Sequence, residues 1–587
     1  MSNNKSPIAT GSDVLVEQLE SYGVEVVFGL CGHTNIAVLD SLSRSKKIQF
    51  VTARHEQAAA HMADGYSRVT GKPGVVLVHV GPGMMNAITG VATAALDSIP
   101  LVVIAGDIPS YYYGRHPHQE VNLHTNSSQW EIYRPFAKRV WRVDRIEDLP
   151  RFTERAFWTA QSGRPGAVLL DVPMDMWSRR QDPALASRYP LPRQFYGPAL
   201  STGAAETIVE KLASARRPLL YLGGGVRQPG VHDDVMRLAE RLGIPIAHSL
   251  MAKGAIPDSH PLVIGMTGFW GTDLANSYAR EADVILALAT RFAETDSSSW
   301  DERFTWKVPG ADLIHIDIDA NEIGRNFPVA IAAVADIRHA AKQLADAAVS
   351  ARARDWSELG KKIAAARQRI WSETAERGML NDFPLKPERI LEDVRKTVPS
   401  NTIFCTDVGW NKNGVAQRYL LPDDGIFITP GGLATMGFGP AAAIGAKYGA
   451  PERPVVALIG DGAMSSQSSA VPTAVEQGIH VIWVVMNNSA FGTIADLEKS
   501  HYGVQYGTVF KDPRGNPYTP DFAALARSCG AWGKRISTAG ELAGALKEAL
   551  RAEGPALVDV PMVNDPVPTP GYWNINDIYQ GTFRATK

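Results

Sequence analysis

Residues 454–462 have the sequence Pro-Val-Val-Ala-Leu-Ile-Gly-Asp-Gly, and a second apolar run at 479–486 ends at Asn487-Asn488. Apolar runs of this length, bounded by glycine and polar residues, are typical of buried strands in parallel sheets. Residues 465–477, between the two runs, have the length and composition of a crossover helix. The sequence therefore predicts two adjacent parallel strands whose carboxyl ends carry Gly-Asp-Gly and Asn-Asn, where open α/β sheets bind ligands.

The polar residues at these strand ends are suited to a cation and a diphosphate. Asp461 and Asn488 offer oxygen ligands, and the absence of Cys and His from the motif favours Mg²⁺ over Zn²⁺. Gly462, Ala463 and the expected helix start at Ser465 would let a diphosphate approach backbone N–H groups and the positive end of a helix. A lone Gly-Asp-Gly is usually only a turn, so the prediction depends on the pairing with Asn-Asn.

Length and composition limit the class of protein. A chain of 587 residues exceeds what one hydrophobic core supports, so about three domains are expected. A net charge of −2 gives no electrostatic reason to expect nucleic-acid or membrane binding, and no apolar run is long enough to span a bilayer. The three scattered cysteines are typical of reduced thiols in a cytoplasmic protein, not of a disulfide or zinc framework.

Strands and helical segments alternate along the chain in three series, which predicts an α/β protein with three doubly wound parallel-sheet domains. We expect the domains at residues 1–180, 200–345 and 385–565. Residues 566–587 are expected to form a tail or lid over the site, or a simple surface strap.

Two further segments are predicted to connect the domains. Residues 178–200, rich in Pro, Arg and Ser, are expected to be a linker. Residues 332–379, charge-rich and helical in pattern, are expected to bridge the second and third domains across the surface.

A second motif, at residues 54–68, reads Arg-His-Glu-Gln-Ala-Ala-Ala-His-Met-Ala-Asp-Gly-Tyr-Ser-Arg. Glu56 alone could be an acid stabilised by a helix N-terminus. Together, however, this segment, Gly460-Asp461-Gly462 and Asn487-Asn488 resemble the thiamine diphosphate-dependent enzyme superfamily, and acetolactate synthases in particular. The resemblance extends from about residue 10 to about residue 575.

The resemblance implies roles for residues at both ends of the cofactor. Glu56 would hydrogen-bond N1′ of the aminopyrimidine, which favours the imino tautomer that removes the proton from C2 of the thiazolium. Gly409 would contact the aminopyrimidine through its backbone. Met436 would be the apolar prop under the bent cofactor, although ordinary core packing is the alternative. The diphosphate and Mg²⁺ would be bound by Gly460, Asp461, Gly462, Ala463 and Asn488, with the carbonyl of Ala490 as a third metal ligand.

The resemblance also covers assembly and the middle of the chain. In this family the glutamate and the diphosphate site come from different subunits, which implies a homodimer or homotetramer with active sites at the subunit interface. Gly223-Gly224-Gly225 and Arg291 resemble parts of a flavin-binding domain, with Arg291 as a cofactor ligand. The residues after Phe292 depart from the family pattern, so FAD, ADP and an empty domain all stay open.

Three histidines stand where acetolactate synthases have other residues. His33 and His79 replace small residues, and His118, beside Gln119, replaces an aromatic residue. A lone histidine is more often structural than catalytic. Three histidines, with Gln119, on loops that should converge on the thiazolium are candidate catalytic residues.

We therefore predict an enzyme that forms or breaks a C–C bond next to the carbonyl of a small-molecule substrate, acetolactate synthase-like and acting on a 2-oxo acid. A tryptophan typical of acetolactate synthases is absent from residues 491–497. Two alternatives stay open. One is a C–C hydrolase of cyclic 1,2-diketones, a class that this chain resembles in its Gly-His-Thr turn and a second histidine. The other is a 2-hydroxyacyl-CoA lyase or oxalyl-CoA decarboxylase-like enzyme, which a phosphate-binding middle domain would fit. A non-catalytic cofactor-binding protein is a further alternative, but such a protein has no need of Glu56.

Overall fold

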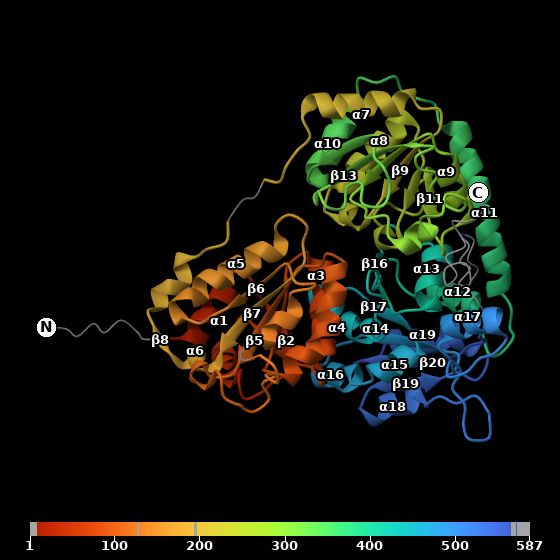
Figure 1. Cartoon of the computed structure of the whole chain (residues 1–587). Coiled ribbons are helices and arrows are strands. Elements are labelled where there is room, and N and C mark those ends of the chain that lie inside the picture. The colour runs from red at the N-terminus through yellow and green to blue at the C-terminus, as the bar shows by residue number, and fades with distance from the viewer. Residues whose placement is uncertain (1–8, 126–127, 193–195, 565–570, 572–587) are drawn as a thin grey trace.

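The computed structural model describes residues 9–125, 128–192, 196–564 and 571. The predicted tail or lid at 566–587 lies outside the described residues except for Gly571. Three six-stranded sheets, in which every neighbouring pair of strands is parallel, confirm the predicted fold class. Figure 1 shows the three sheets as separate bodies, with the N-terminal one beside the C-terminal one and the central one above them.

The inner strands of each sheet are apolar runs buried on both faces. β17 (Val455–Gly460) illustrates this, because its residues from Val455 to Ile459 are at most 1 % exposed. Helices cover both faces, as the parallel connections require. The strand orders are as follows: β3 (Gln49–Thr52), β2 (Val26–Gly29), β4 (Gly74–Val78), β5 (Leu101–Asp107), β7 (Ala167–Pro173) and β6 (Arg139–Arg142) in the N-terminal sheet; β11 (Val263–Met266), β10 (Ile246–His248), β9 (Pro218–Leu222), β12 (Val284–Leu288), β13 (Asp312–Asp317) and β14 (Ile331–Val334) in the central sheet; β16 (Ile426–Ile428), β15 (Ile403–Thr406), β17, β18 (Ile482–Asn487), β20 (Ala556–Pro561) and β19 (Trp532–Arg535) in the C-terminal sheet.

The helices follow the strands in the alternating order that the sequence predicts. Their bounds are α1 (Gly11–Ser21), α2 (Ile36–Arg44), α3 (Glu56–Thr70), α4 (Pro82–Leu96), α5 (Leu149–Gln161) and α6 (Met174–Ser178) at the N-terminus; α7 (Thr202–Ser214), α8 (Val231–Leu242), α9 (Asp273–Glu281), α10 (Ile337–Ala348) and α11 (Ser357–Gly378) in the middle; and α12 (Pro387–Thr397), α13 (Trp410–Arg418), α14 (Phe438–Gly449), α15 (Asp461–Ser466), α16 (Ala470–Glu476), α17 (Gly492–Tyr502), α18 (Phe522–Ser528) and α19 (Glu541–Leu550) at the C-terminus. No helix among the described residues is long and apolar enough to cross a membrane.

Three segments differ from their sequence-based predictions. The single crossover helix at 465–477 is two helices, α15 and α16, and the Ser466 hydroxyl at the break donates to the Ala463 carbonyl, which competes with helix continuation. Residues 178–200 include a short strand, β8 (Arg180–Gln181), paired antiparallel with β1 (Ala9–Thr10). In 332–379, β14 and α10 belong to the central sheet layer, so only α11 runs from the central to the C-terminal part (Figure 1).

The N-terminal and C-terminal parts meet where α3 crosses α14. Glycines make this crossing close: a Cβ added at Gly65 would lie 2.1 Å from the carbonyl oxygen of Ala442, and one at Gly445 would lie 1.7 Å from that of Met62. The two backbones therefore touch directly, which fixes the N-terminal sheet against the C-terminal one.

We expect Gly65→Ala to lower the melting temperature, because the added methyl group collides with backbone that cannot move aside; overpacking of this kind costs about 1–3 kcal/mol. Gly544→Ala is the matched control, since Gly544 lies inside the exposed face of α19 with open space around it. Alanine is the better helix former there, so this variant should melt at the same or a higher temperature. Equal effects of the two substitutions would contradict the packing argument.

Candidate active site

The N-terminal sheet brings together the three candidate histidines and Glu56. His33 and His79 follow the ends of the neighbouring strands β2 and β4, and the His33 ring centroid lies 6.1 Å from that of His79 and 5.9 Å from that of His118. Glu56 is the first residue of α3, is 4 % exposed, and accepts a hydrogen bond of 3.0 Å from Asn86 on α4. One small region of the N-terminal part therefore holds a buried acid and three imidazoles.

His79 occupies a slot between two glycines. A Cβ at Gly32 would lie 2.2 Å from Cγ of the imidazole, and one at Gly83 would lie 2.7 Å from its Cδ2. Burial lowers the pKa of His79, Glu56 opposes this shift, and His33 adds to it. The buried Nδ1 of this ring has no hydrogen-bond partner among the described residues. His79 is thus held neutral, with one ring nitrogen free to take or give a proton.

The other two histidines and Gln119 are more accessible. His33 and His118 are exposed in the single chain, and Gln119 is half-buried. Gln119 has a φ of +66°, and its carbonyl oxygen packs against Gly81, where a Cβ would lie only 1.8 Å away. This contact fixes the loop that carries His118 beside the strand end that carries His79.

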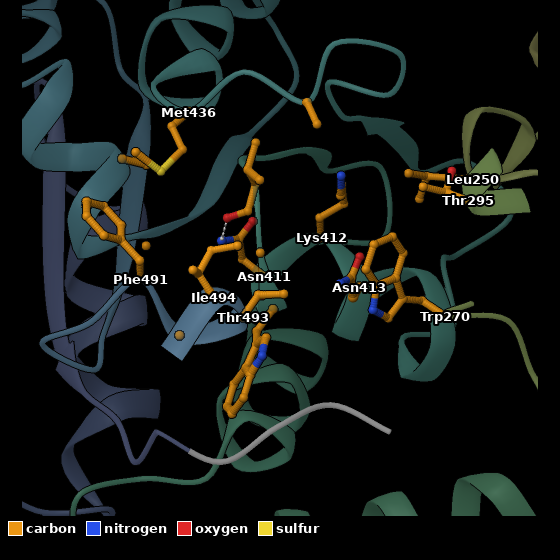
Figure 2. A pocket seen from close by; sticks show the side chains of 18 of the residues that line it. Leu250, Trp270, Thr295, Asn411, Lys412, Asn413, Met436, Phe491, Thr493 and Ile494 are labelled. Atoms are coloured by element: carbon orange, nitrogen blue, oxygen red, sulfur yellow. Dashed lines mark hydrogen bonds between the residues drawn. The ribbon is translucent and has the colours of Figure 1, made fainter. Parts of the chain in front are cut away.

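The C-terminal sheet forms a cavity of about 410 Å³ at its carboxyl edge. Its wall includes the segments after β15, β17 and β18 and a face of the central part that carries Leu250, Trp270 and Arg291. Figure 2 shows Met436 and Phe491 at one end of this cavity, Asn411 in the middle, and Leu250 and Thr295 at the other end. Of the predicted cofactor and metal ligands, this cavity gathers Gly409, Met436, Gly460, Asp461, Gly462, Ala463, Asn488, Ala490 and Arg291.

Three oxygen atoms face one another in the cavity wall. The Asn488 amide nitrogen donates to Oδ1 of Asn564 at 2.8 Å, which leaves the amide oxygen 3.0 Å from the carbonyl oxygen of Ala490 and 3.2 Å from Oδ1 of Asp461. Turning over the amides of both Asn488 and Asn564 would satisfy all of these atoms within the chain, so the orientation in which the Asn488 oxygen faces the other two oxygens is the one that a bound cation would select. Burial raises the pKa of Asp461 to about 7, and its Oδ2 has no partner among the described residues.

This arrangement fits a hard divalent cation. Two oxygens that bind one Mg²⁺ at right angles, each about 2.1 Å from it, lie about 3.0 Å apart, close to the two distances around Asn488. A cation would also keep the Asp461 carboxylate charged. The described residues contain no group of three or more His, Cys, Asp and Glu side chains placed so that they could hold a metal ion, so amide and carbonyl oxygens are needed to complete any such site.

Comparison with known proteins identifies the family. Family models described as "Thiamine pyrophosphate enzyme", for the N-terminal TPP binding, central and C-terminal TPP binding domains, match residues 9–127, 205–344 and 407–560. The chain belongs to the thiamine pyrophosphate enzyme family. It is 33 % identical over 565 residues to the probable acetolactate synthase large subunit of Methanocaldococcus jannaschii, covering 94 % of this chain and 91 % of the relative. It is also 33 % identical to acetolactate synthase isozyme 3 large subunit of Escherichia coli K12, covering 92 % of each.

This thiamine diphosphate-dependent, acetolactate synthase-like enzyme holds its two groups of candidate residues apart within one chain. No described residue of the N-terminal sheet layer lines the 410 Å³ cavity. Asn86, which bonds Glu56, precedes Thr93 by seven helical residues, or about 10 Å of rise. Thr93 is the residue of α4 that contacts Thr435, next to Met436, at 2.8 Å. Glu56 therefore lies about two helical turns away from the segment that carries Met436.

Asp407 organises the thiamine diphosphate enzyme's cavity, and sequence reasoning did not single it out. Its two oxygens accept hydrogen bonds from the N–H groups of Val408 at 2.8 Å, Gly437 at 3.2 Å and Gly439 at 2.8 Å. Full burial raises its pKa to about 6. Because Gly437 follows Met436, the carboxyl group ties the end of β15 to the segment that carries the candidate prop. In the sequence, the position of Asp407 directly after a buried strand is the feature that could have identified it as a site residue.

Lys412 and Asn413 are two further cavity residues that the sequence analysis missed. Both lie in the first turn of α13, just after Gly409, whose φ of 104° and ψ of −149° suit only glycine. Helical spacing could have identified these two residues, because side chains three or four positions after Gly409 face the same crevice as the strand end.

Proposed function

We propose that this enzyme cleaves a 2-oxo acid beside its carbonyl and joins the remaining acyl unit to a second carbonyl compound, as an acetolactate synthase-like carboligase. The observation that carries the proposal is the convergence of the Asp461, Asn488 and Ala490 oxygens in the same cavity as Gly409 and Met436. This is the arrangement needed to hold a metal-bound diphosphate at one end and leave the reacting ring beside open space.

The residues of this chain then have separate tasks. Bound thiamine diphosphate supplies a nucleophilic carbon that adds to the carbonyl and accepts the electron pair of the bond that breaks. Asp461, Asn488 and the Ala490 carbonyl would hold Mg²⁺, and Gly460, Gly462 and Ala463 would leave room for the diphosphate. Glu56 would hold a proton at the aminopyrimidine, and Met436 would support the cofactor from the cavity wall.

We also propose that the active enzyme is a homodimer or a homotetramer. Within one chain, Glu56 is separated from the Met436 segment, so each site would take Glu56 from one subunit and the cavity from another. Apolar side chains beside both regions are exposed in the single chain, including Ile36 (59 %) and Met85 (49 %) on one side and Ile494 (55 %) on the other. Exposed apolar groups of this kind are typical of a surface that another chain covers.

The central part is proposed to hold FAD or ADP. Arg291 lines a cavity of about 120 Å³ next to Gly223, Gly224 and Gly225, and two of these glycines also border a cavity of about 480 Å³ that Arg227 and Arg338 line. Together these spaces are large enough for a nucleotide. The three cysteines are free thiols, which supports the proposed cytoplasmic location.

A C–C hydrolase of cyclic 1,2-diketones is the second candidate function. The observation that favours it is the cluster of His33, His79 and His118 described above, with one imidazole nitrogen buried and unpartnered. Hydrolysis must add water and protonate a carbon, and both steps use a nearby acid or base. A decarboxylation followed by ligation needs fewer protein acids, because CO₂ leaves without a proton.

Glu56→Gln should lower turnover by about 10²–10⁴-fold, the usual size of general acid–base help, while binding of thiamine diphosphate is kept. The measurements are turnover of a 2-oxo acid and cofactor content after desalting. Glu17→Gln on the exposed face of α1 is the matched control and should leave both unchanged. Turnover within twofold of the parent would refute the assigned role.

Asn488→Ala should release Mg²⁺ and, with it, thiamine diphosphate, because one of the three converging oxygens is lost; Asp461→Ala should do the same. Asn487→Ala is the control, since the Asn487 amide donates to Asp559 at 2.9 Å and its loss should affect stability more than metal content. The measurement is the magnesium content of each variant after desalting. Full occupancy in Asn488→Ala, or equal loss in Asn487→Ala, would overturn the ligand assignment.

His79→Ala and His33→Ala should separate the two candidate functions. If the histidines act in proton transfer, turnover falls at least tenfold with an unchanged melting temperature. Because burial lowers the pKa of His79, a neutral His79 base loses activity only as pH falls through a value below the usual 6.5 or so, and that acid limb should vanish in His79→Ala. Unchanged turnover and pH–rate profiles in these variants and in His118→Ala would favour the carboligase over the hydrolase.

A further inference from the structure

Lys412 is a buried cation that has no partner among the described residues. Its side chain is 5 % exposed, lines the 410 Å³ cavity, and makes no hydrogen bond or ion pair with any described residue. Burial lowers the pKa of its ammonium group, and Asp97, Asp407 and Asp296 oppose that shift from a distance. A buried charge is normally paired, because taking it out of water costs several kcal/mol.

The nearby carboxylates are already engaged elsewhere. Asp97 bonds Arg68 and the N–H groups of Gly431 and Gly432, and Asp407 bonds three N–H groups. Asp296 accepts from the N–H of Leu250 at 3.2 Å. None of them lies within ion-pair distance of Lys412, so no described residue neutralises this ammonium group.

A second polar side chain beside Lys412 is also unsatisfied. Asn413 is 2 % exposed, lines the same cavity, and its Oδ1 has no partner among the described residues. Figure 2 shows Lys412 and Asn413 between Asn411 on one side and Trp270 and Leu250 on the other. Both follow Gly409 in the first turn of α13, where the helix end also favours negative charge.

We propose that Lys412 and Asn413 form an anion-binding subsite that holds the carboxylate of the second, acceptor substrate. The inference rests on the proposed carboligase function and names the substrate class that the cavity selects: a 2-oxo acid in preference to an aldehyde. Arg291, the other cation of the cavity wall, belongs to the central part and adds positive potential at that end.

Lys412 is better suited to the carboxylate of the acceptor than to that of the donor, because only the acceptor's carboxylate keeps its charge throughout the reaction. In the reaction the donor loses CO₂, its acyl carbon bonds to the acceptor's carbonyl carbon, and the acceptor's oxygen takes up a proton while the acceptor's carboxylate is unchanged. An ammonium group that held the donor's carboxylate would stabilise the ground state of a charge that must disappear, which slows the reaction. When the same ammonium group binds the acceptor's carboxylate, it stabilises the substrate, the transition state and the product to the same extent.

Binding can be tested without turnover. The enzyme saturated with thiamine diphosphate and Mg²⁺ is titrated with oxamate, a carboxylate shaped like a 2-oxo acid, and with oxamide, its uncharged counterpart. Tryptophan fluorescence is the readout, since Trp270 and Trp410 line the cavity. Lys412→Met should weaken oxamate binding at least tenfold and leave oxamide binding unchanged. Lys412→Arg should retain part of the preference, and Lys499→Met, at an exposed lysine of α17, should retain all of it.

Selectivity gives a second readout that does not depend on the overall rate. With pyruvate as donor, a second pyruvate as acceptor gives acetolactate, whereas added acetaldehyde gives acetoin. The two acceptors differ only by the carboxylate. At fixed concentrations of both, Lys412→Met should lower the ratio of acetolactate to acetoin at least tenfold. An unchanged ratio would overturn the proposal.

Further measurements exclude the other roles for Lys412. Because removal of an unpaired buried charge does not weaken the folded state, Lys412→Met should melt at the same or a higher temperature than the parent. A parallel loss of thiamine diphosphate affinity would assign Lys412 to the diphosphate, and loss of a copurified nucleotide would assign it to the central cofactor; either result overturns the proposal. If the parent forms neither product while oxamate binding still requires Lys412, the proposed carboligase function fails and the anion subsite stands.

Discussion

At the carboxyl edge of each sheet, the chain leaves two neighbouring strands in opposite directions, and the crevice between the departing segments cannot be filled by either crossover. In this protein that point lies between β2 and β4, between β9 and β12, and between β15 and β17. The sheet order therefore decides which residues become neighbours. Most candidate functional residues follow one of these six strands, including His33 with His79, Gly223 with Arg291, and Gly409 with Asp461.

The crevices also hold buried polar groups that have no hydrogen-bond partner. Nδ1 of His79, Oδ2 of Asp461 and Oδ1 of Asn413 have no partner among the described residues, and each such group costs on the order of 1–3 kcal/mol. Asp407 differs from these groups, because its carboxyl group accepts three backbone hydrogen bonds and thereby holds the neighbouring segments of the site together. A ligand that supplies hydrogen-bond partners to these unsatisfied groups should stabilise the folded chain.

The alternation of strands and helices could be predicted from the sequence because continuous apolar runs report burial on both faces. The pairing of Asp461 with Asn488 could be predicted for the same reason, since both follow such runs. The break between α15 and α16 could not, because a serine hydroxyl bond at one position decides it. The burial of Lys412 could not be predicted either. In the sequence it is an ordinary helical lysine, and the cavity that it lines is completed by Trp270 and Arg291, more than a hundred positions earlier.

The separation of Glu56 from the Met436 segment within one chain gives the proposed assembly a physical consequence. A cofactor held by Glu56 of one subunit and by Asp461 and Asn488 of another binds only the associated form, so cofactor and association stabilise each other by mass action. The Gly65–Gly445 contact of α3 with α14 matters for the same reason. It keeps the N-terminal and C-terminal sheets of one chain in a fixed orientation, so in the proposed assembly the surface that presents Glu56 and the surface that bears the cavity would meet a partner chain as one rigid unit.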